Sequence, residues 1–148
     1  MSIINKSFWL LGDIITIKVT GDETGGRYTV LDIQVSPNNG PPLHKHSREE
    51  EGYYIVEGNF LFLYGDKEIK ATKGMFLYAE RGKFHTYKNI SDTPGKLVVV
   101  VTPAGFEHFF EDAAILVENT STFNPPVDYQ FDENKMVQIA AKYGLQFK

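Results

Sequence analysis

Apolar residues recur at every second position in several stretches between residues 14 and 102. In 14–19 and in 30–35, the positions of one parity are all isoleucine, leucine or valine. Because alternate side chains of a strand point to opposite faces of a sheet, this period predicts strands with one buried face. Shorter β-branched or aromatic runs continue the series at 53–56, 60–64, 75–78 and 97–101.

Turn-forming residues separate these runs. Glycine, asparagine, aspartate and proline gather at 21–26, 38–42, 57–59, 65–66 and 73–74, where they favour tight turns. The breaks are too short for helical crossovers, so we expect the strands to pair antiparallel. Many short strands at this spacing predict an all-β sandwich or barrel.

The last third of the chain has a different pattern. Residues 106–114 fit one short helix, and 123–126 fit an extended connector. A second helix is predicted for 132–143, because Asp132 is a suitable N-cap, its apolar residues share one stripe and Gly144 follows as a stop. We expect this helix to pack on the outside of the barrel. The chain is expected to be one domain over residues 1–148, with a barrel core near 14–102 and a helical extension near 106–148.

Composition narrows the function classes. The 148 residues are 42% hydrophobic and carry a net charge of -4 without any basic run, which argues against nucleic acid as a partner. No stretch approaches the roughly 20 apolar residues that a membrane span needs, and residues 1–13 lack the pattern of a signal peptide. The absence of cysteine excludes disulfides and thiol catalysis and fits a reducing compartment, so we expect a cytoplasmic protein.

Three of the four histidines and one glutamate form the candidate metal site. His44 and His46 lie two residues apart and would point to one face of a strand, and Glu51 and His85 can enter neighbouring strands toward the same interior. Imidazoles with one carboxylate suit one divalent transition metal, namely Fe, Mn, Ni, Cu, Co or Zn, better than Ca or Mg. We expect His108, the remaining histidine, to be exposed and not a ligand.

Two segments around these residues resemble the two motifs of the cupin family. In the first, 40–58, a His-x-His pair is followed by Glu51 and then by Gly58 at the family's spacing. In the second, 74–89, two glycines, His85 and an asparagine fall in register. The resemblance implies a double-stranded β-helix, or jelly-roll, barrel with the metal inside, held by His44, His46, Glu51 and His85.

The chain departs from the family pattern in two places. Glu80 stands where the family has a proline in the turn before His85, so Gly82 and packing must shape that turn. The spacer from Gly40 to His44 is shorter than usual, and we expect Pro41 and Pro42 to stiffen it.

Parity along the strands predicts which side chains line a pocket next to the metal. We expect the residues at alternate positions from Glu51 and from His85 to point inward, and likewise one further pair on 75–78. These side chains either line an aromatic pocket or only fill the barrel. The segment 102–110 resembles single-domain cupins of the quercetin dioxygenase type, and its aromatic residues would wall the pocket mouth or be simple core. The candidate pocket residues are Tyr53, Ile55, Phe76, Tyr78, Tyr87, Phe106, Phe109 and Phe110.

The charged residues at 48–50 are expected to form a solvated turn. The apolar stretch 8–11 has two interpretations. Cupins often pair through N-terminal strands, so the resemblance implies a homodimer for which 8–11 would supply an edge. Alternatively, 8–11 packs against the barrel of its own chain.

The resemblance and the pocket together favour a metal-dependent, dioxygenase-like oxidoreductase that acts on a small organic substrate, aromatic or flavonoid-like. Glu51 is the candidate catalytic base, because a carboxylate ligand can take a proton from the substrate. The alternative is a non-catalytic module that binds or senses a small molecule. A third class is a metal-assisted isomerase, which usually needs more charged groups in its pocket.

Overall fold

The computed structural model describes residues 5–148; the predicted domain begins at residue 1, so its first four residues lie outside the described part. The strands are β1 Lys6–Leu10, β2 Asp13–Val19, β3 Thr29–Val35, β4 His44–His46, β5 Glu50–Glu57, β6 Phe60–Tyr64, β7 Lys67–Ala71, β8 Phe76–Ala79, β9 His85–Asn89, β10 Gly95–Thr102, β11 Ile115–Val117 and β12 Leu145–Phe147. The helices are α1 Glu107–Ala113 and α2 Glu133–Lys142.

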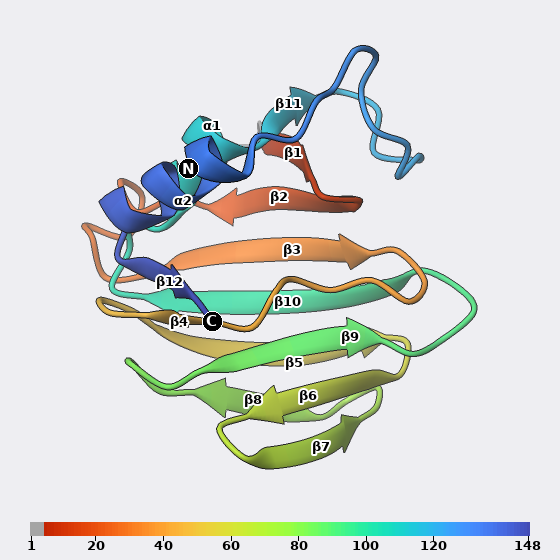
Figure 1. Ribbon diagram of the computed structural model, residues 1–148. Coiled ribbons are helices and arrows are strands. Elements are labelled where there is room, and N and C mark those ends of the chain that lie inside the picture. Colours follow the sequence, from red (N-terminus) through yellow and green to blue (C-terminus); the bar gives the residue numbers. More distant parts are fainter. Residues whose placement is uncertain (1–4) are drawn as a thin grey trace.

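The strands form two sheets that face each other (Figure 1). Within residues 5–148, one sheet has seven strands in the order β11-β1-β2-β3-β10-β5-β8, and the other has five in the order β12-β4-β9-β6-β7. Neighbouring strands pair antiparallel. The predicted all-β jelly-roll architecture is therefore confirmed.

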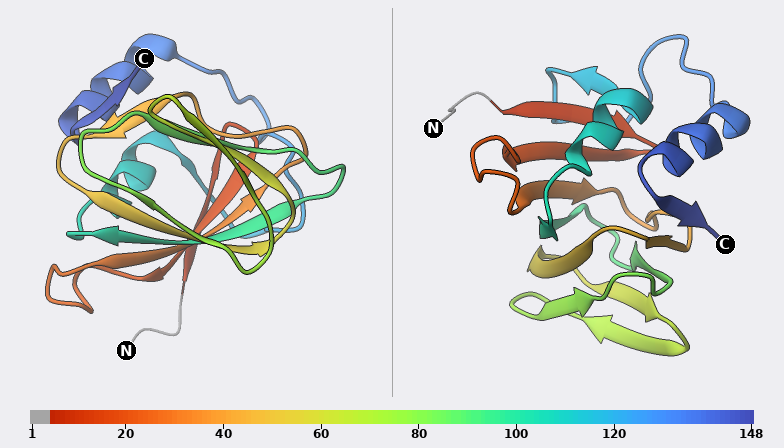
Figure 2. Two further views of the ribbon diagram at one scale, coloured as in Figure 1. Left: turned by 90° about the horizontal axis from the view of Figure 1, so that it is seen from below. Right: turned by 90° about the vertical axis from the view of Figure 1, so that its left-hand side faces the viewer.

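The core lies between the two sheets. Viewed from below, the sheets curve around a common interior, with the helices along one side (Figure 2). Ile55 and Leu97 from the larger sheet and Phe60 from the smaller one are completely buried there. Alternation along the strands places these apolar side chains inward, and their removal from water is the main force that holds the sheets together.

The outer face of β1 and β2 is also covered. Trp9 pairs with Ile14 in the hairpin, and both are buried although they point away from the barrel interior. The connector before α2 lies over them: the Trp9 indole N–H donates to the carbonyl of Phe123 over 2.9 Å, and its ring packs against Tyr129.

The stretch 8–11 thus packs within its own chain. β1 is hydrogen-bonded to β2 on one side and to β11 on the other, so both its edges are occupied. A homodimer remains a prediction, and it would need another surface than the edges of β1.

Both predicted helices are present. The Asp132 carboxylate caps α2 by accepting from the backbone N–H of Lys135 over 3.0 Å, and the helix ends just before Gly144. As predicted, α2 packs outside the barrel, against α1 and β12. The short strands β11 and β12 were not predicted, nor was β7. No helix within residues 5–148 is long and apolar enough to cross a membrane.

Candidate metal centre

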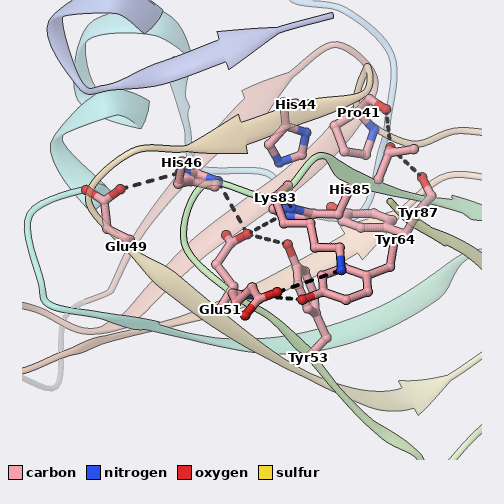
Figure 3. A network of polar contacts seen from close by, with 12 residues as sticks. Pro41, His44, His46, Glu49, Glu51, Tyr53, Tyr64, Lys83, His85 and Tyr87 are labelled. Carbon is pink, nitrogen blue, oxygen red and sulfur yellow. Dashed lines mark hydrogen bonds and ion pairs between the residues drawn. The ribbon is translucent and has the colours of Figure 1, made fainter. Parts of the chain in front are cut away.

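His44, His46, Glu51 and His85 converge between the two sheets. β4 carries the first two histidines and β9 carries His85, directly opposite His44 in the strand register, so all three rings share one face. Glu51 comes from β5 of the other sheet. One ligand atom from each residue lies within 4.8 Å of all the others, and all four side chains are buried (Figure 3).

Backbone carbonyls orient two of the three rings. The Nδ1 atom of His44 lies 2.7 Å from the carbonyl oxygen of Pro42, and that of His85 lies 2.9 Å from the carbonyl oxygen of Lys83. Because a carbonyl oxygen only accepts hydrogen bonds, we assign the proton of each ring to Nδ1. This assignment leaves the Nε2 lone pairs for the centre of the cluster, as in histidines that bind metals.

The donor set fits a metal cation. The Nε2 atom of His85 lies 2.7 Å from an Oε atom of Glu51, and that of His46 lies 3.3 Å from the same oxygen (Figure 3). Lone pairs that face a carboxylate at such distances need a positive charge between them, either a proton or a metal ion. Three nitrogens and one carboxylate are ligands for a divalent transition metal, so this cluster could hold one.

The charges of the site follow from burial and from Glu51. Burial lowers the pKa of His44 to about 4, so this ring is neutral at pH 7. Burial would lower the pKa of His46 as well, but Glu51 and Glu49 raise it to about 9. Burial opposes ionisation of Glu51 too, yet His46 and His85 hold the pKa of its carboxyl well below the usual range. Glu51 is therefore an anion at neutral pH.

Glu49 corrects the prediction that 48–50 is a solvated turn. Arg48 is exposed, but Glu49 is only 5% exposed, and its carboxylate lies 3.5 Å from Nδ1 of His46 on the side away from Glu51 (Figure 3). Neither Nδ1 of His46 nor the facing Oε atom of Glu49 has a hydrogen-bond partner of standard geometry within the described chain. A signal was available in the sequence, because Glu49 shares the parity of Glu51. Glu49 directly precedes β5 and continues its alternation.

Changing Glu49 to glutamine should weaken metal binding about tenfold, at the lower end of what changes behind a metal-binding histidine usually cost. The Glu49 carboxylate lies 3.5 Å from Nδ1 of His46. Its charge should favour a proton on Nδ1 and so leave Nε2 for the site, which an uncharged amide would do less strongly. A competition titration with a chromophoric chelator measures this affinity directly.

Glu50→Gln is the matched control, because Glu50 is next in sequence but its carboxylate bonds to Tyr78 on the outer face. We expect its metal affinity to equal that of the wild type. Equal losses in both variants would show that Glu49 does not orient His46.

A cavity of about 110 Å³ adjoins the cluster, and His44, His46 and Glu51 line one end of it. Of the predicted pocket residues, Tyr53, Tyr87, Phe106 and Phe109 line this cavity. The ring of Phe106 lies edge-on to His46, with 4.5 Å between the centroids.

Two other predicted pocket residues are core. Ile55 and Phe110 are buried, as their patterns predicted, but they do not line the cavity. Burial of these two side chains therefore says nothing about contact with a ligand.

The inward prediction for Phe76 and Tyr78 was wrong. They are 61% and 54% exposed, because the register of β8 against β5 puts Leu77 opposite the inward Tyr53. Directly paired residues of antiparallel strands point to the same face, so the alternate residues of β8 point outward. All four residues of 75–78 are apolar, and the run itself gave no indication of its parity.

The cavity has walls that were not predicted. Met136 from α2 and both Leu145 and Phe147 from β12 close one side of it. Asp13 at the start of β2 also lines it. Its parity with the inward Ile15 was visible in the sequence, but nothing there showed that β2 reaches the same cavity as the histidines.

The departures from the motif pattern are compensated locally. Gly82 has a φ of 78°, and its N–H donates to the carbonyl of His46 over 2.8 Å, which ties the turn before His85 to β4 without a proline. Pro42 accepts from His44, as described above, and Pro41 accepts from Thr86 over 2.6 Å. His108 is exposed on α1 beside Glu111 and lies outside the cluster, as predicted.

The described part of the chain is a two-sheet barrel with a buried histidine–glutamate cluster. Residues 31–101, which contain both motifs, match the cupin domain family. An uncharacterized protein of Methanocaldococcus jannaschii is 35% identical over 74 residues, which are 50% of this chain and 57% of that protein. An oxalate-binding protein of Thermotoga maritima is 28% identical over 69 residues, 47% of this chain and 57% of its own length.

A solved structure shows the same fold. The crystal structure of a predicted oxalate decarboxylase from Thermotoga maritima superposes with a TM-score of 0.59 at 19% identity, over 69% of this chain and 94% of that one. The chain spans about half the length of the curated relatives it matches. The fold, the two motifs and the match to the family model together support the assignment of residues 31–101 to the cupin superfamily.

Proposed function

We propose that this protein is a metal-dependent oxidoreductase of the dioxygenase type that acts on a small organic molecule. The observation that carries the proposal is the position of Glu51. Its carboxylate is buried among three histidines that could bind a metal, and it lines the cavity in which a substrate would lie.

His44, His46, Glu51 and His85 would hold the metal. When bound, a divalent metal would lower the pKa of a substrate hydroxyl or enol that contacts it. Glu51 would accept the proton that the substrate loses, since it is the only acidic side chain in the cluster. The Tyr53 hydroxyl donates to the same carboxylate over 2.5 Å and so keeps it turned toward the cavity. Phe106 and Phe109 exclude water from that end.

The size of the cavity limits the substrate. A cavity of about 150 Å³ holds benzene, and the cavity here measures about 110 Å³. A short-chain compound or part of a single ring fits inside it, whereas a complete flavonoid would have to protrude. Within the quercetin dioxygenase-like group that the sequence resembles, we therefore favour a smaller substrate than a flavonol.

A non-catalytic binding module is the second candidate. The Thermotoga maritima relative is an oxalate-binding protein, and a metal that only shapes a pocket needs no base. Under this alternative, Glu51 would serve as a ligand alone.

Oxygen consumption separates the two candidates. The protein would be purified without a histidine tag, its metal content measured, and samples loaded in turn with Fe, Mn, Ni, Cu, Co or Zn. Each would be tested in an oxygen electrode against enediols, catechol, small 2-oxo acids, oxalate and a flavonol. We expect oxygen uptake with at least one small compound and one metal. Thermal stabilisation by a compound without turnover would favour the binding module, and the absence of any bound metal would contradict both.

A further inference from the structure

The second buried carboxylate of the cavity belongs to Asp13, which is 6% exposed. One of its oxygens accepts from the backbone N–H of Ser36 over 3.1 Å and from the side-chain amide of Asn39 over 2.9 Å. Every side-chain hydrogen bond of Asp13 within the described chain goes to this one oxygen, including a longer contact to the Ser36 hydroxyl. The other oxygen keeps its capacity to accept.

Tyr87 is the neighbouring polar group. Its ring lines the same cavity and is 6% exposed, and its hydroxyl has no hydrogen-bond partner within residues 5–148. A tyrosine hydroxyl with an ordinary pKa of about 10 is protonated at neutral pH. The Tyr87 hydroxyl is therefore available as a hydrogen-bond donor.

The charge of the cavity lining is unbalanced. None of the described residues that line it is a lysine or an arginine, whereas Asp13 and Glu51 are both acidic. Burial raises the pKa of Asp13 to about 6, so its carboxylate is mostly ionised at pH 7. Any positive charge from a bound metal and from His46 lies beside Glu51. A ligand carboxylate near Asp13 would meet repulsion without compensation.

We propose that Asp13 and Tyr87 form a second polar subsite, which binds a hydroxyl group of the substrate and rejects a second carboxylate. The free oxygen of Asp13 accepts from that hydroxyl, and the hydroxyl of Tyr87 donates to it. Resting on the proposed function, this inference names the substrate class: a small molecule with one oxygen group for the metal and one hydroxyl at its far end, and not a dicarboxylate.

Three probes with the same four-carbon skeleton test the subsite: butyrate, 4-hydroxybutyrate and succinate. Their dissociation constants would be measured by titration calorimetry at pH 7 on cobalt-loaded and on EDTA-treated protein. We expect 4-hydroxybutyrate to bind about tenfold more tightly than butyrate, the size of one well-formed buried hydrogen bond, and succinate to bind more weakly than butyrate. In Asp13→Asn and in Tyr87→Phe, the preference for 4-hydroxybutyrate over butyrate should fall below threefold.

Two controls carry the same chemical changes on the outside of the barrel: Asp32→Asn, which breaks a half-buried pair with Lys96, and Tyr54→Phe. Both should keep the wild-type preference. The subsite is overturned if the wild type binds butyrate and 4-hydroxybutyrate equally, if Asp13→Asn keeps the preference, or if no probe binds either form at millimolar concentration. Cobalt uptake, followed by its visible spectrum, is a separate readout: its absence contradicts the proposed function, and the probe ratios in EDTA-treated protein still decide the subsite.

Discussion

Glu51→Gln should lower turnover at least about a hundredfold, the lower range of what a general base contributes, while most of the metal stays bound. An amide cannot take up the substrate proton, but its oxygen can still face a metal and accept from Tyr53, which donates to the carboxylate over 2.5 Å. The histidines that supply the other ligands are unchanged. Oxygen uptake with the compound found in the substrate screen and metal content by mass spectrometry measure the two effects independently.

The comparison variant is again Glu50→Gln, one position earlier on β5, whose side chain bonds to Tyr78 on the outer face. It should keep both activity and metal. If Glu51→Gln loses metal and turnover in equal proportion, Glu51 is a ligand and not the base. That result would also favour the binding module over the enzyme.

Gly40→Ala should destabilise the protein by about 3 kcal/mol, the upper range for forcing extra atoms into a packed site. A Cβ atom at this position would lie 1.8 Å from the carbonyl oxygen of Tyr87 on β9. The chain is held to β9 on both sides of Gly40, which blocks relief. Before it, Asn89 accepts from Asn38 and donates to Asn39, each over 2.9 Å. After it, the Thr86 hydroxyl donates to the carbonyl of Pro41 over 2.6 Å. Urea unfolding of EDTA-treated protein measures the loss.

Metal binding should weaken in the same variant, because β9 also carries His85. Gly25→Ala is the control. Its Cβ would meet no atom within 4 Å, and only its φ of 63° opposes the change, at a cost of about 1 kcal/mol. Equal losses in the two variants would mean that the 36–42 segment can move away from β9.

Most differences between prediction and structure arise because alternation along a strand shows which residues share a face, but not which face is buried. Tyr53 and Tyr87 were placed correctly because each shares a strand with a polar residue that marks the interior. Phe76 and Tyr78 were misplaced because their run has apolar residues on both faces, so only the pairing of β8 with β5 could decide. Glu49 was misplaced for the opposite reason: its parity was right, but its charge suggested solvent.

Short strands without a pattern of their own were the other omission. β11 and β12 have three residues each, which is too few for a period of two to be recognised. They are strands only because β1 and β4 offer them free edges. β12 matters for function, since Leu145 and Phe147 wall the cavity.

The sequence by itself determined most of the strands, the two helices and the four residues of the metal cluster, because these depend on local period, capping and the register of the two motifs. Only the tertiary structure decided that the four side chains come close enough to share one metal ion. His44, His46 and His85 lie on one sheet and Glu51 on the other, and their separation depends on how the two sheets pack. The same packing placed Glu49 behind His46 and Asp13 in the shared cavity. Parity states which face a side chain occupies, but distances across a barrel are set by contacts between residues far apart in the chain.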